Sequence, residues 1–234
     1  MYFVGREKEI GQIKEALEEG KNVIVSGKYG MGRTRLVQYV AEGMRKQWRF
    51  FFADFSKTPG AICHHLVREL FPGQEFRREY MRYKSSRFRI VSLDFSDKRR
   101  HVLVLDNIAK LSSQKIDFIR YLAWEKRFQF VAIVENFVSE SDLMRLRVGI
   151  HPATMIELRR LSISHVTDFF RNLSKTHEFH WTEAQIKNLS QASGGYPLRM
   201  REIARRELER NRQRMNSTVE AQASKRLIGY SNKP

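Results

Sequence analysis

The spacing of hydrophobic residues changes several times along the chain, and each change predicts a different kind of element. Short apolar runs rich in β-branched residues, such as VIVSG at 23–27, predict strands. Stretches in which apolar residues recur every three or four positions predict helices. Strands are expected at 22–26, 48–55, 101–107, 128–136 and 154–161, and helices at 6–19, 33–46, 59–71 and 113–126. This alternation predicts an α/β fold, a parallel sheet with helices on both faces.

After Leu161 the pattern becomes all-helical. A helical stripe begins at Val166, and Thr182 with Gln185 forms a capping box for the helix that follows. Two glycines and Pro197 separate that helix from a last one, which is expected to end near residue 214. We therefore expect an α/β domain over 1–160, a small all-helical lid over 161–214, and a polar, flexible tail over 215–234.

Composition narrows the class of protein. Hydrophobic residues make up 41% of the chain and charged residues 29%, which indicates a folded protein and excludes a disordered one. No apolar run approaches the roughly 20 residues of a membrane helix. From the residues at the amino terminus we expect no secretory leader. A single cysteine, Cys63, excludes an internal disulfide. We expect a cytoplasmic protein without membrane contact.

The net charge of +17 predicts a polyanionic partner, with DNA as the expected nucleic acid. Basic residues gather in two segments: 77–100, where tyrosines and phenylalanines are interleaved, and 199–214, which holds seven arginines. A solvated helix face with arginine–glutamate pairs also explains the second segment. Aromatic side chains packed inward on a helix also explain the first.

The stretch after the first strand, GKYGMGRT at 27–34, has the composition of a phosphate-binding loop. Gly27, Gly30 and Gly32 allow the backbone to curl so that its N–H groups point inward. A helix begins directly after the loop and brings the positive end of its dipole, and the hydroxyl of Thr34 can reach a magnesium ion. Asp106, at the carboxyl end of the buried run HVLVLDN, is a second candidate ligand for that ion.

Four stretches together resemble P-loop ATPases of the AAA+ and STAND branches, closest to archaeal-type ATPases and more distantly to origin-recognition and transposon-helper ATPases. FVGREKEI at 3–10 is similar to the first box of that group, and GKYGMGRT is similar to Walker A. HVLVLDN is similar to Walker B, and SGGYPLRM at 193–200 is similar to the lid motif. The resemblance implies a P-loop NTPase lobe followed by a lid, with ATP or ADP and Mg²⁺ as cofactors.

The resemblance also implies roles for individual residues. Thr34 and Asp106 would hold the metal, and Asn136 or its rival Glu135 would be the first sensor, with Arg199 as the second. The catalytic set is Asp106, Asn107, Glu135, Asn136 and Arg199. The nucleotide-binding set is Gly27, Lys28, Tyr29, Gly30, Met31, Gly32, Arg33, Thr34 and Arg35. Candidates for an arginine that completes a neighbouring subunit's site are Arg145, Arg147, Arg159 and Arg160.

Two residues depart from the family pattern. Arg33 stands where Walker A has lysine; it keeps the charge, but a guanidinium is bulkier than the ammonium it replaces. Lys28, in the same loop, is a candidate to assist it. Asn107 stands where these families have the acidic residue that orients the attacking water, and an amide cannot accept a proton as a carboxylate does. We expect nucleotide binding with slow or absent hydrolysis, unless Glu135 replaces the missing carboxylate.

The expected function is that of an AAA+/STAND-like ATP-binding protein. Its nucleotide state would control self-association, as a homo-oligomer, or binding to a partner, with DNA through segments 77–100 and 199–214. Two alternatives stay open: a non-enzymatic adaptor that has kept the fold, and a basic nucleic-acid-binding protein with a vestigial nucleotide site. Zinc is not expected, because the paired histidines at 64–65 point apart on a helix and His177 with His180 lacks further ligands.

Overall fold

The computed structural model describes residues 4–72, 83–92 and 97–230, with side chains described as far as residue 213. The chain divides into two compact units. The α/β unit is Arg6–Arg159, and the helical unit combines Met1–Gly5 with Arg160–Pro234.

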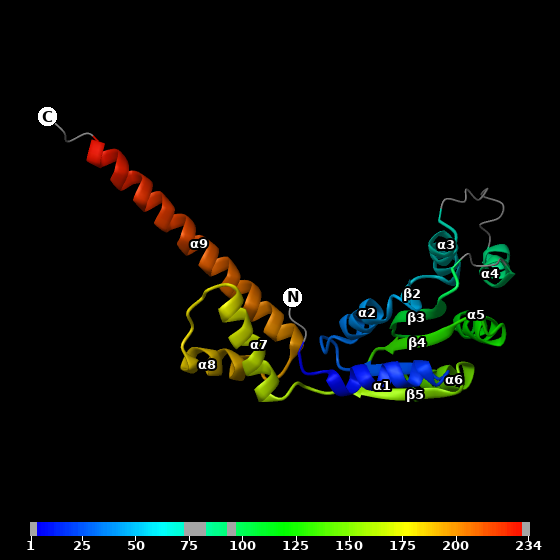
Figure 1. Cartoon of the computed structure of the whole chain (residues 1–234). Coiled ribbons are helices and arrows are strands. Elements are labelled where there is room, and N and C mark those ends of the chain that lie inside the picture. Colours follow the sequence, from blue (N-terminus) through cyan, green and yellow to red (C-terminus); the bar gives the residue numbers. More distant parts are fainter. Residues whose placement is uncertain (1–3, 73–82, 93–96, 231–234) are drawn as a thin grey trace. The chain divides into compact units, whose positions relative to one another are not determined.

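A five-stranded parallel sheet forms the centre of the α/β unit (Figure 1). Its strands are β1(Asn22–Gly27), β2(Trp48–Asp54), β3(Arg100–Ile108), β4(Gln129–Val134) and β5(Ala153–Leu158), in the order β2-β3-β4-β1-β5. Gly27 pairs with Leu158, and Asp54 pairs with Asp106. These pairs bring the ends of β1, β2 and β3 to one edge of the sheet, the edge at which ligands bind in folds of this kind.

Helices cover both faces of this sheet. Most strand residues are therefore buried, whichever face their side chains point to. α1(Glu7–Glu18) and α2(Arg33–Met44) pack against β1 and against each other. The opposite core includes residues of α3(Pro59–Leu70), α4(Tyr83–Ser92), α5(Ser113–Trp124) and α6(Glu140–Gly149). On β3 the side chains alternate: Leu103 and Leu105 join that second core, and Val102 and Val104 are buried on the other face. The predicted fold class is confirmed.

The helical unit contains α7(Ile163–Thr176), α8(Glu183–Ser193) and α9(Pro197–Tyr230). Its core is built on the predicted stripe, with Val166, Phe169 and Phe170 packed against Ile186 and Met200. The capping box predicted at the start of α8 is confirmed: the hydroxyl of Thr182 accepts from the backbone N–H of Gln185, whose side chain accepts from the backbone N–H of Thr182. None of the helices in the described part of the chain has the length and apolarity needed to cross a bilayer.

Three helical features differ from the sequence expectation. No helix was expected between residues 136 and 153, yet α6 forms there behind the Ser139 cap; its pattern is weak because Leu146 is its single buried residue. α4 forms inside the basic segment 77–100, for which a helix was only one of two explanations. α9 continues to Tyr230, well past residue 214, because no glycine or proline interrupts residues 198–228. The tail expected over 215–234 is therefore helical through Tyr230, and 231–234 lie outside the described residues.

Candidate functional site

The loop between β1 and α2 has the backbone that the glycines predict. Gly27 has φ 148°, and a Cβ there would lie 3.0 Å from the carbonyl oxygen of Leu158 on the neighbouring strand. Gly32 caps α2 in the left-handed region, at φ 82° and ψ 27°. No side chain caps this helix. The amides of its first turn therefore remain available to an anion, and the helix dipole favours one there.

Thr34 and Asp106 meet at this edge of the sheet. The Thr34 hydroxyl donates to Asp106 Oδ1 at 3.0 Å, and the backbone N–H of Asn107 donates to the same oxygen at 2.8 Å. Burial raises the pKa of Asp106, with the Asp54 carboxylate adding to it, against these hydrogen bonds and the positive charge of Arg33. A carboxylate kept partly from water beside a hydroxyl is a pair of oxygens that suits Mg²⁺.

Asp54 is a functional candidate that the sequence analysis missed. It ends β2 directly beside Asp106, and its Oδ1 accepts from Asn107 Nδ2 at 3.2 Å and from the backbone N–H of Ser56 at 3.0 Å. Burial opposes ionisation of Asp54, but the hydrogen bonds from Ser56 and Asn107 outweigh it and lower the pKa. An available signal was the apolar run WRFFFAD, which ends in aspartate as HVLVLD does.

Arg33 begins α2, but its side chain is buried, with 6% of it exposed. Its Nη1 donates to the carbonyl oxygens of Gly27, at 2.8 Å, and of Val134, while Nη2 donates to Glu135 Oε2 at 2.6 Å. The carboxylate of Glu135, the candidate replacement for a water-orienting residue, is thus engaged by Arg33.

The other predicted residues lie in different surroundings. Lys28, Tyr29 and Arg35 are exposed, and Arg35 forms an ion pair of 3.4 Å with Glu42. Asn136 is exposed just beyond β4. Arg199, in the first turn of α9, is exposed in the helical unit, and the structure does not group it with the α/β residues.

The first box contributes a residue whose role the sequence did not reveal. Arg6 is buried, and its Nη2 donates to the carbonyl oxygen of Arg159 at 2.7 Å and to that of Met31 at 3.5 Å. Nη1 donates to Glu9 at 2.8 Å. Since Met31 belongs to the glycine-rich loop and is itself buried, Arg6 helps to hold the loop in place.

A glycine-rich loop that joins an interior strand to an uncapped helix, with an aspartate at the carboxyl end of another strand, defines a P-loop nucleotide-binding protein. More particularly, the chain belongs to the AAA ATPase domain family, whose model matches residues 2–134. No curated protein sequence matches the chain significantly.

Solved structures of AAA+ proteins share the fold. Cdc6p of Pyrobaculum aerophilum is 15% identical over 79% of this chain and 54% of its own, with a TM-score of 0.56. The RuvB Holliday junction branch migration motor of Thermotoga maritima is 15% identical over 93% and 65%, with a TM-score of 0.57. The ORC1 protein of Aeropyrum pernix, solved in complex with DNA, is 14% identical over 90% and 67%, with a TM-score of 0.55. The chain thus spans just over half of the Cdc6p chain and about two thirds of the other two.

Proposed function

We propose that this protein binds ATP or ADP with Mg²⁺ at the 27–34 loop and that the bound nucleotide controls self-association or binding to a partner, with DNA as the expected nucleic acid. The observation that carries the proposal is the hydrogen bond of 3.0 Å between Thr34 and Asp106. It joins the start of the uncapped helix α2 to the end of β3, although 71 residues lie between the two in the chain.

The residues present suit the magnesium ion. The Thr34 hydroxyl and the Asp106 carboxylate supply hard oxygen ligands, the kind that Mg²⁺ prefers beside phosphate oxygens. At Gly27 a side chain would have no room beside Leu158, so the start of the loop requires glycine. When bound, the ion would offset the charge of the phosphates, and the amides of α2 would orient them.

Slow or absent hydrolysis follows from the surroundings of two side chains. Asn107 is exposed at φ 59°, and its amide is bonded to Asp54. Glu135 is bonded to Arg33. A water-orienting group typically contributes about 10²–10⁴-fold to the rate. With an amide at one position and an engaged carboxylate at the other, we expect turnover to be slower by a factor of that order.

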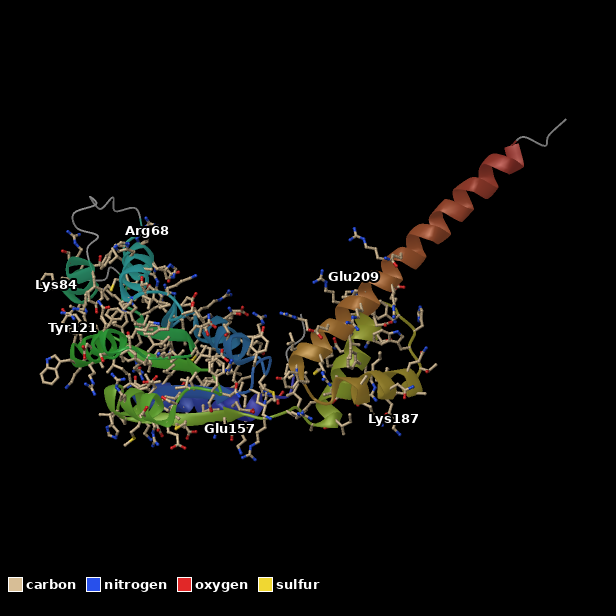
Figure 2. All side chains as sticks on the ribbon, turned by 180° about the vertical axis from the view of Figure 1, so that it is seen from behind. Arg68, Lys84, Tyr121, Glu157, Lys187 and Glu209 are labelled. Atoms are coloured by element: carbon tan, nitrogen blue, oxygen red, sulfur yellow. The ribbon has the colours of Figure 1, made fainter. Side chains whose placement is uncertain are left out.

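The arginines of α9 support a DNA partner. Arg205 pairs with Glu209, a residue labelled in Figure 2, at 2.9 Å, and Arg210 pairs with Glu207 at 2.7 Å. Arg201, Arg206 and Arg212 are exposed and make no ion pair among the described side chains. Free arginines on one helix suit a phosphate backbone. Two proteins of the same fold point the same way, an ORC1 solved with DNA and a branch migration motor.

The second basic segment, 77–100, supports the DNA proposal less. Arg77, Arg78 and Arg82 lie outside the described residues. Arg87 of α4 lies over the ring of Tyr121, 4.3 Å from its centroid. Figure 2 labels Tyr121, together with Lys84 of the same helix α4. Arg99 pairs with Asp97 at 2.5 Å. Much of the described positive charge in this segment is therefore already engaged. Of the aromatic residues interleaved in it, Phe88 is 64% exposed.

A non-enzymatic adaptor is the second candidate, and the bond between Asn107 and Asp54 favours it. Calorimetric titration with Mg-ATP and Mg-ADP tests the first step for both candidates, and we expect Thr34→Ala to weaken binding about tenfold or more when magnesium is present. Phosphate release, measured with and without DNA, then separates a slow ATPase from an adaptor. No association at millimolar nucleotide in the wild-type protein would refute both and leave the vestigial site.

Self-association and DNA binding are tested separately from catalysis. Sedimentation with and without nucleotide reports the first. For the second, each phosphate neutralised adds about 0.9 to the slope of log affinity against log salt. Replacing Arg201, Arg206 and Arg212 together by Gln should lower that slope by up to about 3.

A further inference from the structure

The Arg33 side chain joins three elements at the carboxyl ends of the strands, and the backbone of Glu135 extends the connection to a fourth. Arg33 is the first residue of α2. Its Nη1 donates to the last carbonyl oxygen of β1, at Gly27, and to the last carbonyl oxygen of β4, at Val134. Its Nη2 holds the carboxylate of Glu135 at 2.6 Å. The backbone N–H of Glu135 in turn donates to the carbonyl of Ile108 at the end of β3, at 2.8 Å.

These bonds lie where water has little access. The Arg33 side chain is 6% exposed and that of Glu135 is 15% exposed. If the guanidinium left to meet a phosphate, two backbone carbonyls and one carboxylate would lose a charged donor in a poorly solvated place. Each such loss is unfavourable, most of all for the carboxylate, because a buried charge without its partner is strongly destabilising.

The shape of the guanidinium explains why arginine suits this position. Its planar fork can donate to three acceptors at fixed angles, whereas an ammonium on a lysine stem is a compact point charge. The three bonds of Arg33 therefore use what distinguishes arginine from the lysine usual in this motif.

We propose that Arg33, with Glu135 as its counterion, is a positioning residue and not a phosphate ligand. It clamps the start of the glycine-rich loop to the end of β4 and so fixes the cradle that receives the phosphates. The negative charge of the phosphates would then be stabilised by the backbone amides of α2 and by magnesium. The part of this inference that concerns nucleotide rests on the proposed function; the clamp itself does not.

A double-mutant cycle with Arg33→Met and Glu135→Gln tests the clamp through thermal stability. We expect Arg33→Met alone to lower the unfolding midpoint by roughly 10 °C, because it leaves the poorly solvated carboxylate of Glu135 without a counterion. We expect the double variant to recover a substantial part of that loss. The matched control is Arg35→Met with Glu42→Gln, an exposed pair on the same helix whose arginine lies two residues after Arg33. Its midpoints should change by no more than about 2 °C and show no coupling.

Comparing the affinities for ATP and for ADP tests the second part of the proposal, that Arg33 is not a phosphate ligand. If Arg33 only positions the loop, Arg33→Met weakens ATP and ADP by the same factor, and the double variant recovers affinity for both to within about threefold of wild type. A group that contacts the γ-phosphate would instead lower the preference for ATP over ADP. Arg33→Gln, which removes the charge but keeps a donor, serves if Arg33→Met does not fold, and it should leave the ATP/ADP preference unchanged.

Three results would overturn the inference. One is the absence of thermal coupling between the two positions. Another is a fall in ATP/ADP preference of tenfold or more when Arg33 is replaced. The third is tighter ATP binding by Glu135→Gln alone, which would mean that the carboxylate competes with phosphate for Arg33. If the wild-type protein binds no nucleotide, the proposed function fails, and the thermal cycle alone decides whether the clamp exists.

Discussion

Gly27→Ala tests whether the glycine-rich loop has the backbone described. Gly27 has φ 148°, a value that residues with a side chain rarely adopt, and conformations of this kind cost about 1–3 kcal/mol. The added Cβ would also lie 3.0 Å from the carbonyl oxygen and 3.1 Å from the Cβ of Leu158, which is fixed by pairing in β5. Relieving that contact adds about 1 kcal/mol, so we expect a loss of roughly 2–4 kcal/mol.

Differential scanning calorimetry with and without Mg-ATP measures both consequences. For a unit of this size, the expected loss lowers the melting temperature by roughly 5–15 °C. The shift that Mg-ATP produces should shrink as well, because the amides no longer converge. The matched control is Gly43→Ala, an exposed glycine inside α2, where alanine should gain roughly 0.5–1 kcal/mol. If Gly27→Ala is as stable as wild type while Gly43→Ala behaves as expected, the backbone described for Gly27 is wrong.

Three further predictions concern ionisable groups. Because burial raises the pKa of Asp106, its charge opposes folding at neutral pH. Without magnesium, Asp106→Asn should therefore have a higher melting temperature than wild type. If Mg-ATP raised the melting temperatures of the variant and of wild type equally, the metal role of Asp106 would be contradicted. The pKa of Asp54 is lowered, so its advantage over Asp54→Asn should be present above the ordinary 3.8 and lost as the pH falls below that value, as melts from pH 7 to 3 would show. Burial raises the pKa of Cys63 from 9.0 to about 12. Between pH 9.0 and about pH 12 only the unfolded chain releases this proton, so the stability of the folded protein should fall as the pH rises through that range, and Cys63→Val should lack this loss. Native Cys63 should also resist alkylation at pH 8.

Local pattern was sufficient for most of the elements. The β-branched run of β3 and the capping box of α8 each depend on neighbours a few residues away, so sequence predicts them well. The weak α6 has one buried residue and lacks an apolar stripe, so its periodicity gave no signal. The end of α9 was placed too early because a polar composition suggested fraying, although residues 198–228 contain no helix breaker.

The sequence by itself determined the loop and its chemistry: three glycines, a helix start, the Thr34 hydroxyl and a strand-end aspartate. Spacing alone could supply these because the loop is continuous in the chain and its needs are local. Which distant groups meet depended on strand order, which no local pattern encodes. Parallel pairing of β2 with β3 placed Asp54 against Asn107, and the position of β4 beside β1 gave Arg33 its bond to Glu135. Therefore only the tertiary structure decided that Arg33 and Glu135 form an ion pair with each other.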